Sequence, residues 1–302
     1  MAETPQQRRC GFIAVIGAPN AGKSTLVNTL VGAKVAIVSR KVQTTRAMLR
    51  GIAVEGDSQL VFMDTPGIFQ PRRRLDRAMV DAAWSGAGDA DIVLLVVDAA
   101  KGIDEELARI LERLADSRLP RLVALNKIDR VNKAQLLELA NELNRRIAFD
   151  STFMISALDG DGTGDLKAYL AGNVPPGPWH YPEGDISDAP LRVMAAEITR
   201  EKLYDRLHDE LPYQATVETT SWQEKTKGIR IEQTIFVERE SQKRIVLGKG
   251  GSMIKHLSTA ARQEISGILE KPVHLFLFVK VRENWGDDPE RYRDLGLIFP
   301  KD

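Results

Sequence analysis

The chain has 302 residues, of which 43% are hydrophobic and 28% charged, a composition that excludes the disordered and fibrous classes. This length has room for two domains, since single domains commonly hold roughly 100 to 150 residues. The 42 basic and 42 acidic side chains give a formal net charge of zero, so any surface for a nucleic acid must be local.

The sequence also argues against a membrane span and a secretory signal. The longest uninterrupted apolar run, residues 92–97, is far shorter than the roughly 20 residues that cross a bilayer. Residues 1–10 are polar and lack the apolar segment of a signal peptide. The single cysteine, Cys10, cannot form an internal disulfide, which fits a reducing compartment. We therefore predict a cytoplasmic protein whose membrane contact, where it occurs, is peripheral.

From residue 11 to about residue 172, short apolar runs alternate with longer amphipathic segments. Strands are predicted at residues 12–16, 60–63, 92–97, 122–125 and 153–155, and helices at 104–115 and 133–148. This alternation indicates a mostly parallel sheet covered by helices on both faces. Residues 48–54 lie too close to the next strand for a helical crossover, so this pair is predicted to be an antiparallel hairpin.

A proline-rich segment separates this half from a second half with a different pattern. Its prolines, which remove backbone donors, are Pro175, Pro176, Pro178 and Pro182. Beyond them we predict a helix at 191–208, strands at 216–222 and 229–237, a glycine cluster and helix at 248–269, and a strand at 273–281. The predicted domains are therefore an α/β domain at residues 8–174, a linker at 175–188 and an α+β domain at 189–302.

The first candidate site follows the first strand and precedes a helix. It matches the phosphate-binding loop GxxxxGK[ST], with the residues Gly17, Ala18, Pro19, Asn20, Ala21, Gly22, Lys23 and Ser24, followed by Thr25. Such a loop closes backbone N–H groups around phosphates at a helix N-terminus. Lys23 is placed to reach the β- and γ-phosphates, and the Ser24 hydroxyl to bind Mg²⁺. A plain glycine turn is the alternative, and the flanking strand and helix argue against it.

A second motif, Asp64-Thr65-Pro66-Gly67, ends the strand predicted at 60–63. The carboxylate of Asp64 can hold Mg²⁺ through water, and the N–H of Gly67 can sense a γ-phosphate. On its own this is a common turn sequence, and its position one hairpin after the phosphate loop supports the functional interpretation.

The third and fourth motifs are predicted to bind the base. Asn126, Lys127 and Asp129 follow one strand, and Ser156 and Ala157 follow the next. Asp129 can accept hydrogen bonds from N1–H and the exocyclic amine of guanine. Adenine has an acceptor at N1 and lacks that amine, so Asp129 selects GTP over ATP. The backbone N–H groups at 156 and 157 are predicted to meet guanine O6.

These four motifs resemble, in order and spacing, those of the Ras-like P-loop GTPases over residues 11–172. The resemblance implies GTP and GDP as ligands, and Mg²⁺ held by Ser24, Thr45 and Asp64. It places Thr45 in the first switch and assigns catalysis to Lys23, Thr45 and Gly67. The phosphate and base contacts would then come from the motif residues at 20–25, 64, 65, 67, 126, 127, 129, 156 and 157.

One position departs from the Ras pattern. Where Ras has a glutamine that orients the attacking water, this chain has Ile68, so we expect slow hydrolysis unless another group supplies charge or orientation. By resemblance to GTPases with the same loop, Asn20 is a candidate for helping to bind K⁺. The alternative is that Asn20 only shapes the loop.

The second half contains a basic stretch, residues 241–263, without an acidic side chain. Within it lies a GxxG loop formed by Gly248, Lys249, Gly250 and Gly251. Such glycines let the backbone approach a sugar-phosphate chain, and Lys249 adds charge. Ile245 and Ile254 are candidates for an apolar floor under unpaired bases, and Lys255 for a further contact. The alternative is a structural corner between two helices with a solvated lysine.

The order helix, strand, strand, GxxG helix pair, strand resembles the type II KH domain, which clamps about four single-stranded nucleotides. As a whole the chain resembles the Era family of bacterial ribosome-assembly GTPases, with shared stretches at residues 43–46, 210–213, 237–240 and 272–275. The resemblance implies binding near the 3′ end of 16S ribosomal RNA, support for maturation of the small (30S) ribosomal subunit, and a peripheral location at the inner membrane. We expect a monomer.

Two other functions and two other features of the sequence bear on this interpretation. A signalling or membrane-regulatory GTPase with a protein partner is the alternative, and Asp129 argues against an ATP-dependent enzyme. The arginines at positions 72, 73, 74 and 77 form either a solvated face or a contact with a polyanionic partner. The four histidines lack metal-ligand spacing, so we predict no zinc site.

Overall fold

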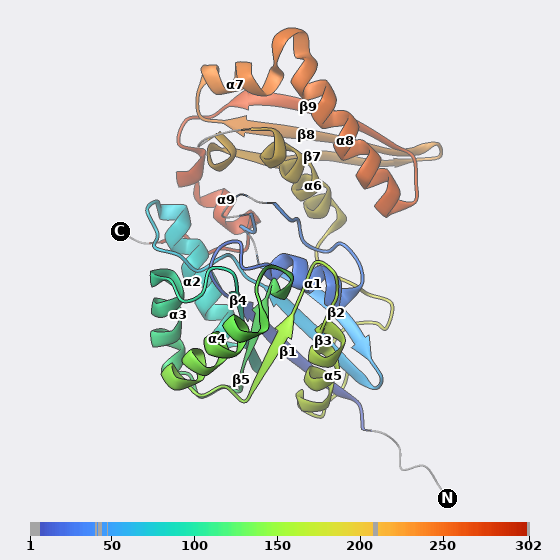
Figure 1. Cartoon of the computed structure of the whole chain (residues 1–302). Helices are drawn as coiled ribbons and strands as arrows, with labels where there is room; N and C mark the ends of the chain where they lie inside the picture. The colour runs from blue at the N-terminus through green and yellow to red at the C-terminus, as the bar shows by residue number, and fades with distance from the viewer. Residues whose placement is uncertain (1–6, 40, 42–43, 47, 208–210, 301–302) are drawn as a thin grey trace, which may run out of the picture. The chain divides into compact units, whose positions relative to one another are not determined.

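The computed structural model describes residues 7–39, 41, 44–46, 48–207 and 211–300. These residues belong to two compact units (Figure 1), of which the first comprises Met1–Ala36, Thr45–Asp188 and Leu295–Asp302. The second comprises Ile37–Thr44 and Ala189–Asp294. The predicted helix end at His208, and residues 43 and 210 of the family-like stretches, lie outside the described residues.

The first unit contains a six-stranded sheet in the order β2-β3-β1-β4-β5-β6. Its strands are β1 (Arg9–Ile16), β2 (Leu49–Glu55), β3 (Ser58–Asp64), β4 (Ile92–Asp98), β5 (Arg121–Asn126) and β6 (Ser151–Ile155). β2 and β3 form an antiparallel pair, and the other neighbouring pairs are parallel. The predicted hairpin and the mostly parallel sheet are confirmed.

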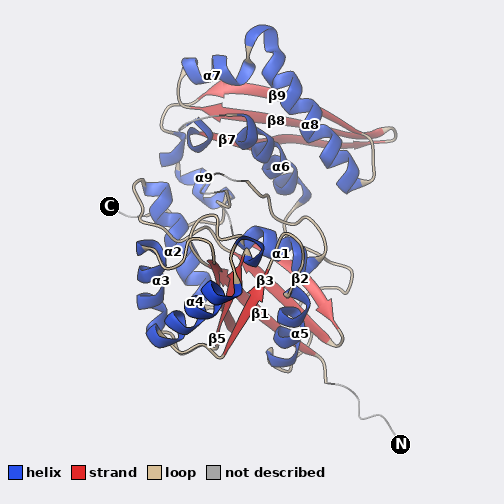
Figure 2. Ribbon diagram, in the orientation of Figure 1, coloured by secondary structure: helices blue, strands red, loops and turns tan. Residues whose placement is uncertain are grey.

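Helices cover both faces of this sheet (Figure 2). The helices α1 (Lys23–Val31) and α5 (Thr163–Asn173) pack on one face, and α2 (Arg74–Gly88), α3 (Glu105–Ala115) and α4 (Lys133–Arg146) on the other. Successive residues of β1 enter opposite clusters, Ile13 and Val15 one and Ala14 and Ile16 the other. Burial on both sides explains why the strands are continuous apolar runs.

The carboxyl ends of the parallel strands bring the candidate motifs together. The phosphate loop follows β1, Asp64 ends β3, and Asn126 ends β5, with a 3₁₀ turn at Ile128–Arg130 just beyond. Asp98, at the end of β4, lies opposite Asn126 in the sheet register. Ligands of open parallel sheets bind at this edge.

The proline-rich segment is hydrogen-bonded to the first unit. The Cys10 N–H donates to the Pro175 carbonyl at 3.1 Å. The buried side chain of Gln59 accepts from the N–H groups of His180 and Tyr181 at 2.9 and 3.0 Å. Arg50 forms an ion pair with Asp188 at 2.9 Å. These contacts hold the segment against strands of the first sheet.

The second unit contains a three-stranded sheet in the order β7-β8-β9. Its strands are β7 (Ala215–Lys225), β8 (Gly228–Val237) and β9 (Val273–Val281), with β7–β8 antiparallel and β8–β9 parallel. The helices α6 (Leu191–Arg206), α7 (Glu240–Leu247) and α8 (Ser252–Leu269) pack on one face, and α9 (Pro289–Asp294) ends the unit. Short 3₁₀ turns lie at Leu211–Gln214, Lys249–Gly251 and Trp285–Asp287.

This arrangement confirms the predicted order of an α/β domain followed by an α+β domain. No helix in the described part of the chain is long and apolar enough to cross a bilayer.

Candidate functional site

The phosphate loop and the second switch motif are in contact. The Ile68 N–H donates to the Gly17 carbonyl at 3.0 Å. A Cβ placed on Gly67 would lie 3.0 Å from Pro19 Cα, so the backbone approaches too closely for a side chain to enter freely. Gly67 therefore lies against the loop expected to hold the phosphates.

Lys23 is buried beneath the phosphate loop. Its Nζ donates to the carbonyls of Gly17 and Ala18 at 3.1 and 3.0 Å. Burial lowers the pKa of Lys23 to about 8, against the opposing charges of Asp64 and Glu106. The ammonium group of Lys23 is therefore buried and hydrogen-bonded to two carbonyls of the phosphate loop.

Three oxygen side chains converge beside Lys23. Ser24 Oγ lies 2.7 Å from Asp64 Oδ2 and 2.9 Å from Thr45 Oγ1, and Thr45 Oγ1 lies 3.2 Å from the same carboxylate oxygen. Burial raises the pKa of Asp64, against the opposing hydrogen bond from Ser24. Among the described residues, no group hydrogen-bonds to the buried Oδ1 of Asp64. Hard oxygen ligands with an unsatisfied carboxylate oxygen fit Mg²⁺.

Asn126 connects the phosphate loop to both base motifs. Its buried side chain donates from Nδ2 to the Ala21 carbonyl at 2.8 Å. Its Oδ1 accepts from the N–H groups of Lys127 and Ala157 at 2.8 and 2.9 Å. A Cβ on Gly22 would lie 2.2 Å from this amide, so only glycine fits there. One amide thus fixes three loops relative to one another.

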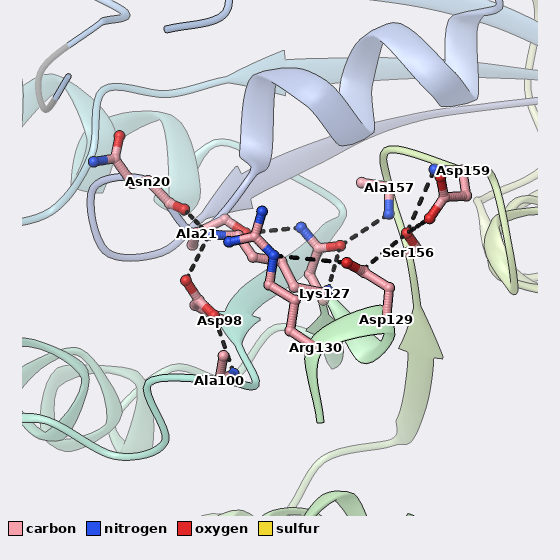
Figure 3. Close-up of polar contacts among 11 residues, drawn as sticks. Asn20, Ala21, Asp98, Ala100, Lys127, Asp129, Arg130, Ser156, Ala157 and Asp159 are labelled. Atoms are coloured by element: carbon pink, nitrogen blue, oxygen red, sulfur yellow. Dashed lines mark hydrogen bonds and ion pairs between the residues drawn. The ribbon is translucent and has the colours of Figure 1, made fainter. Parts of the chain in front are cut away.

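Lys127 reinforces the same connection and reveals a residue that the motifs do not contain. Its Nζ donates to the Asn20 carbonyl at 2.7 Å and to Asp98 Oδ2 at 2.5 Å (Figure 3). Asp98 was missed by sequence reasoning. Its signal was its place at the carboxyl end of β4, next to Asn126 in the register.

The base-recognition residues lie together but differ from expectation in one respect. Asp129 Oδ1 lies 3.2 Å from Ser156 Oγ, which also lies 2.7 Å from Asp159 Oδ2, another residue that sequence reasoning missed. The Ser156 N–H donates to the Asp161 carbonyl at 3.0 Å, and the Ala157 N–H to Asn126. Both N–H groups that were expected to meet guanine O6 are therefore occupied, because they hold this loop to its neighbours.

Three further side chains lie near the phosphate site in sequence. Thr65 is buried and its Oγ1 donates to the Val15 carbonyl at 2.8 Å, so only its backbone is open to a nucleotide. Thr25 lies in the first turn of α1 and is half-buried. Ile68 is buried in the core cluster with Ile16 and Met63, so its alkyl side chain points away from the phosphate site.

The GxxG loop joins α7 to α8 in the second unit. Gly248, Gly250 and Gly251 have φ values of 72°, 61° and 78°, which favour glycine. A Cβ on Gly248 would lie 2.7 Å from Met253 Cβ, whereas one on Gly250 or Gly251 meets nothing within 4 Å. Gly248 is therefore needed for packing, and the other two leave the backbone open.

The side chains around this loop have the expected exposure. Lys249 and Lys255 are exposed, Ile245 is 53% exposed, and Ile254 is half-buried. An exposed isoleucine between lysines is available to an apolar surface such as a base. Separately, no group of three or more His, Cys, Asp or Glu side chains that could hold a metal ion occurs among the described residues. The absence of a zinc site stays a prediction.

Two family models match the chain. A model described as 50S ribosome-binding GTPase matches residues 12–127, and a KH domain model matches residues 210–286. GTPase Era of Bradyrhizobium diazoefficiens is 63% identical over 301 residues, covering 99% of this chain and 98% of that protein. GTPase Era of Rhizobium meliloti is 64% identical over 294 residues, covering 97% of this chain and 94% of that protein. The chain belongs to the Era family of GTPases.

Solved structures of Era have the same architecture over nearly the whole chain. One, at 35% identity and a TM-score of 0.91, covers 96% of this chain and 99% of its own. That Era is in complex with MgGDPNP and nucleotides 1506–1542 of 16S ribosomal RNA. A second, from Aquifex aeolicus, has the same identity and TM-score, covers 95% of this chain and 99% of its own, and is bound to GDP and AlF4⁻.

We expect Asp129→Asn to move nucleotide preference from guanine to xanthine. The amide presents a donor where guanine N1–H requires an acceptor, and the loss of hydrogen bonds to a charged group should weaken GDP binding roughly tenfold to a hundredfold. Competition of GDP and XDP against a fluorescent nucleotide measures the change. Asn126→Ala is the control, since it disconnects the loops and should weaken both nucleotides. Unchanged GDP affinity in Asp129→Asn would contradict the role of Asp129.

Proposed function

We propose that the chain is a GTPase that hydrolyses GTP to GDP and phosphate and binds 16S ribosomal RNA near its 3′ end. Through this binding it assists maturation of the small ribosomal subunit. The proposal rests on one observation: this member of the Era family has both a guanine-nucleotide site and an open GxxG loop. The Era complex with a 16S fragment supports the identity of the RNA.

In the hydrolysis step, the chain's own groups position phosphate charge. Lys23 would contact the β- and γ-phosphates, and the Gly67 N–H the γ-phosphate. Ser24, Thr45 and Asp64 would hold Mg²⁺, which neutralises developing charge when bound. With Ile68 buried in the core, no glutamine-like side chain orients water from that position. Slow hydrolysis, raised by an added cation or partner, follows from this arrangement.

Nucleotide state is proposed to reach the KH domain through the chain segment before Thr45. Residues Ile37–Thr44 belong to the second unit, and the chain returns to the first at Thr45. Within the second unit, the N–H of Val38 donates to Glu201 at 2.8 Å, and Arg200 donates to the carbonyl of Thr44. Binding of Thr45 to Mg²⁺ in the GTP state, and its release after hydrolysis, would therefore shift a segment that is hydrogen-bonded to α6.

Arg200 is suited to hold this segment. Its side chain is 1% exposed and is paired with Glu197. Although burial alone lowers the pKa of Arg200, the charge of Glu197 raises it above the usual value, so the guanidinium stays charged. Lys41 also attaches the segment to α6, because its Nζ donates to the carbonyls of Tyr204 and Leu207 at the end of that helix.

The remaining parts of the proposal concern partners, location and domains. The description of the matching GTPase model, 50S ribosome-binding GTPase, names the large subunit, but this model covers only residues 12–127. The structure of Era with a 16S fragment matches 96% of the chain and so includes the KH domain. We therefore favour the small subunit over both the large subunit and a protein-partner signalling role. We propose a cytoplasmic monomer with peripheral inner-membrane contact, divided at residues 8–174, 175–188 and 189–302.

We expect K⁺ to accelerate GTP hydrolysis relative to Na⁺ by roughly tenfold or more, below the 10³–10⁵ of an arginine finger. Asn20 has a φ of 62°, so Asn20→Gly keeps the left-handed backbone and removes only the amide. This variant should lose the K⁺ effect while keeping its affinity for GDP. Phosphate release in each salt at constant ionic strength measures it, and equal rates in both salts would rule out a K⁺ role.

Gly251→Asp should weaken binding of single-stranded RNA by about tenfold or more, because it places a carboxylate beside the phosphates. The position has a φ of 78° and open space for a Cβ, and aspartate tolerates this backbone. Gly251→Asn is the matched neutral control and should bind nearly as well as the unchanged chain. Fluorescence anisotropy with a labelled 16S 3′-end RNA measures both. Full binding by Gly251→Asp, with intact GDP affinity, would instead favour a protein partner.

A further inference from the structure

The sheet of the second unit has an inner face covered by helices and an outer face that is only partly covered. Ile235 and Val237 of β8 pack in the inner core. Between them Phe236 points outward, where the guanidinium of Arg291 from α9 lies 4.3 Å from its ring centroid. The α9 helix therefore covers the end of the outer face near Phe236. Farther along, toward the start of β9, outward side chains are exposed.

Two phenylalanines occupy this uncovered part. Phe276 is 40% and Phe278 48% exposed, whereas their neighbours Leu275 and Leu277 pack in the inner core. Two residues along a strand separate successive outward side chains by about 6.6 to 6.8 Å. Two rings in line on a sheet are the arrangement on which RNA-recognition sheets stack two or three bases.

Basic side chains frame the two rings. The Arg230 guanidinium lies 4.3 Å from the Phe276 ring centroid and is oriented by Glu232 Oε1 at 2.7 and 3.1 Å. His274 and Lys280 are exposed on either side of the phenylalanines along β9. The residues Arg230, His274, Phe276, Phe278 and Lys280 are called the aromatic face below. Two acidic residues neighbour this face in the register: Glu232 is paired with Arg230, and Glu218 of β7 is paired with Arg291.

A cavity adjoins one end of the aromatic face. Its volume is about 600 Å³, and it lies between the last turns of α8 and the start of β9. Its basic lining residues are Arg262, Lys271 and His274, against one acidic residue, Glu270. His274 belongs to both the cavity and the aromatic face. Since α8 begins at the GxxG loop and ends at this cavity, it links the two along one helix of 18 residues.

We propose that the aromatic face is a second binding surface for single-stranded RNA. One base stacks on Phe278 and the next on the guanidinium plane of Arg230, which lies over the Phe276 ring, and Lys280 and the basic cavity hold phosphates. The inference rests on the proposed RNA-binding function and extends it beyond the GxxG clamp. Aromatic rings between cations suit any base and a charged backbone.

The test compares short and long RNAs on the full chain loaded with GDP. Labelled single strands of about 4 and about 12 nucleotides are used, the shorter sufficient for a KH clamp. In Phe276→Leu/Phe278→Leu, apolar bulk is kept but the rings are lost. We expect affinity for the longer RNA to fall about tenfold or more, and affinity for the shorter to stay unchanged. Ile298→Ala, at an 85% exposed apolar residue of the first unit, is the control and should change neither.

Each outcome decides the proposal. Unchanged binding of the longer RNA by the double leucine variant would overturn it, and an equal loss for both lengths would do so too, since the rings would then act through the clamp. Lys280→Gln should reduce the slope of affinity against salt for the longer RNA by about one, which loss of packing would not do. Failure of the proposed function has a different signature, because Gly251→Asp would then leave both RNAs bound as before.

Discussion

The nucleotide site depends on one buried amide. Asn126 holds the phosphate loop through Ala21 and the last base motif through Ala157, and it also accepts from the next residue of its own loop. These groups lie in loops that follow different strands. Without this amide, the loops would lose the hydrogen bonds that fix their positions relative to one another. Because the amide is buried and its donors and acceptors are satisfied, breaking one bond would leave an unpaired polar group, at about 1–3 kcal/mol.

A second constraint lies where the chain passes from the second unit to the first, between Thr44 and Thr45. Ile37–Thr44 is part of the second unit, and the next residue, Thr45, shares hydrogen bonds with Ser24 and Asp64 in the first. A single peptide bond therefore separates a residue bound to α6 from a candidate Mg²⁺ ligand. In the proposed switch, the chain itself would connect the nucleotide site to the second unit at this point.

Much of this organisation could be predicted from sequence, for physical reasons. Strands buried on both faces are apolar runs, and motifs with fixed chemistry mark their ends. The α2 and α5 helices were not predicted; in α5 the apolar residues show almost no helical periodicity. The partners of Lys127 and Ser156, Asp98 and Asp159, were missed because isolated aspartates have no motif, and only strand register and loop closure bring them in.

Other features lie beyond local sequence patterns altogether. The transfer of Ile37–Thr44 to the second unit depends on contacts more than 150 residues apart in the chain. The alternation in β9 predicts a strand but not which of its outward side chains are covered. In the structure α9 packs over Phe236, whereas Phe276 and Phe278 stay exposed. The N–H groups at 156 and 157 are occupied by neighbouring loops, which no spacing reveals.

The central claim is that the nucleotide in the first unit controls RNA binding by the second. The most direct measurement is the affinity of a fluorescent single-stranded RNA from the 3′ end of 16S ribosomal RNA, with GDP and with a non-hydrolysable GTP analogue. The account predicts tighter binding with the analogue, since γ-phosphate and Mg²⁺ order Thr45 and the segment before it. Equal affinity in the two states would contradict it, leaving an RNA-binding GTPase without nucleotide control.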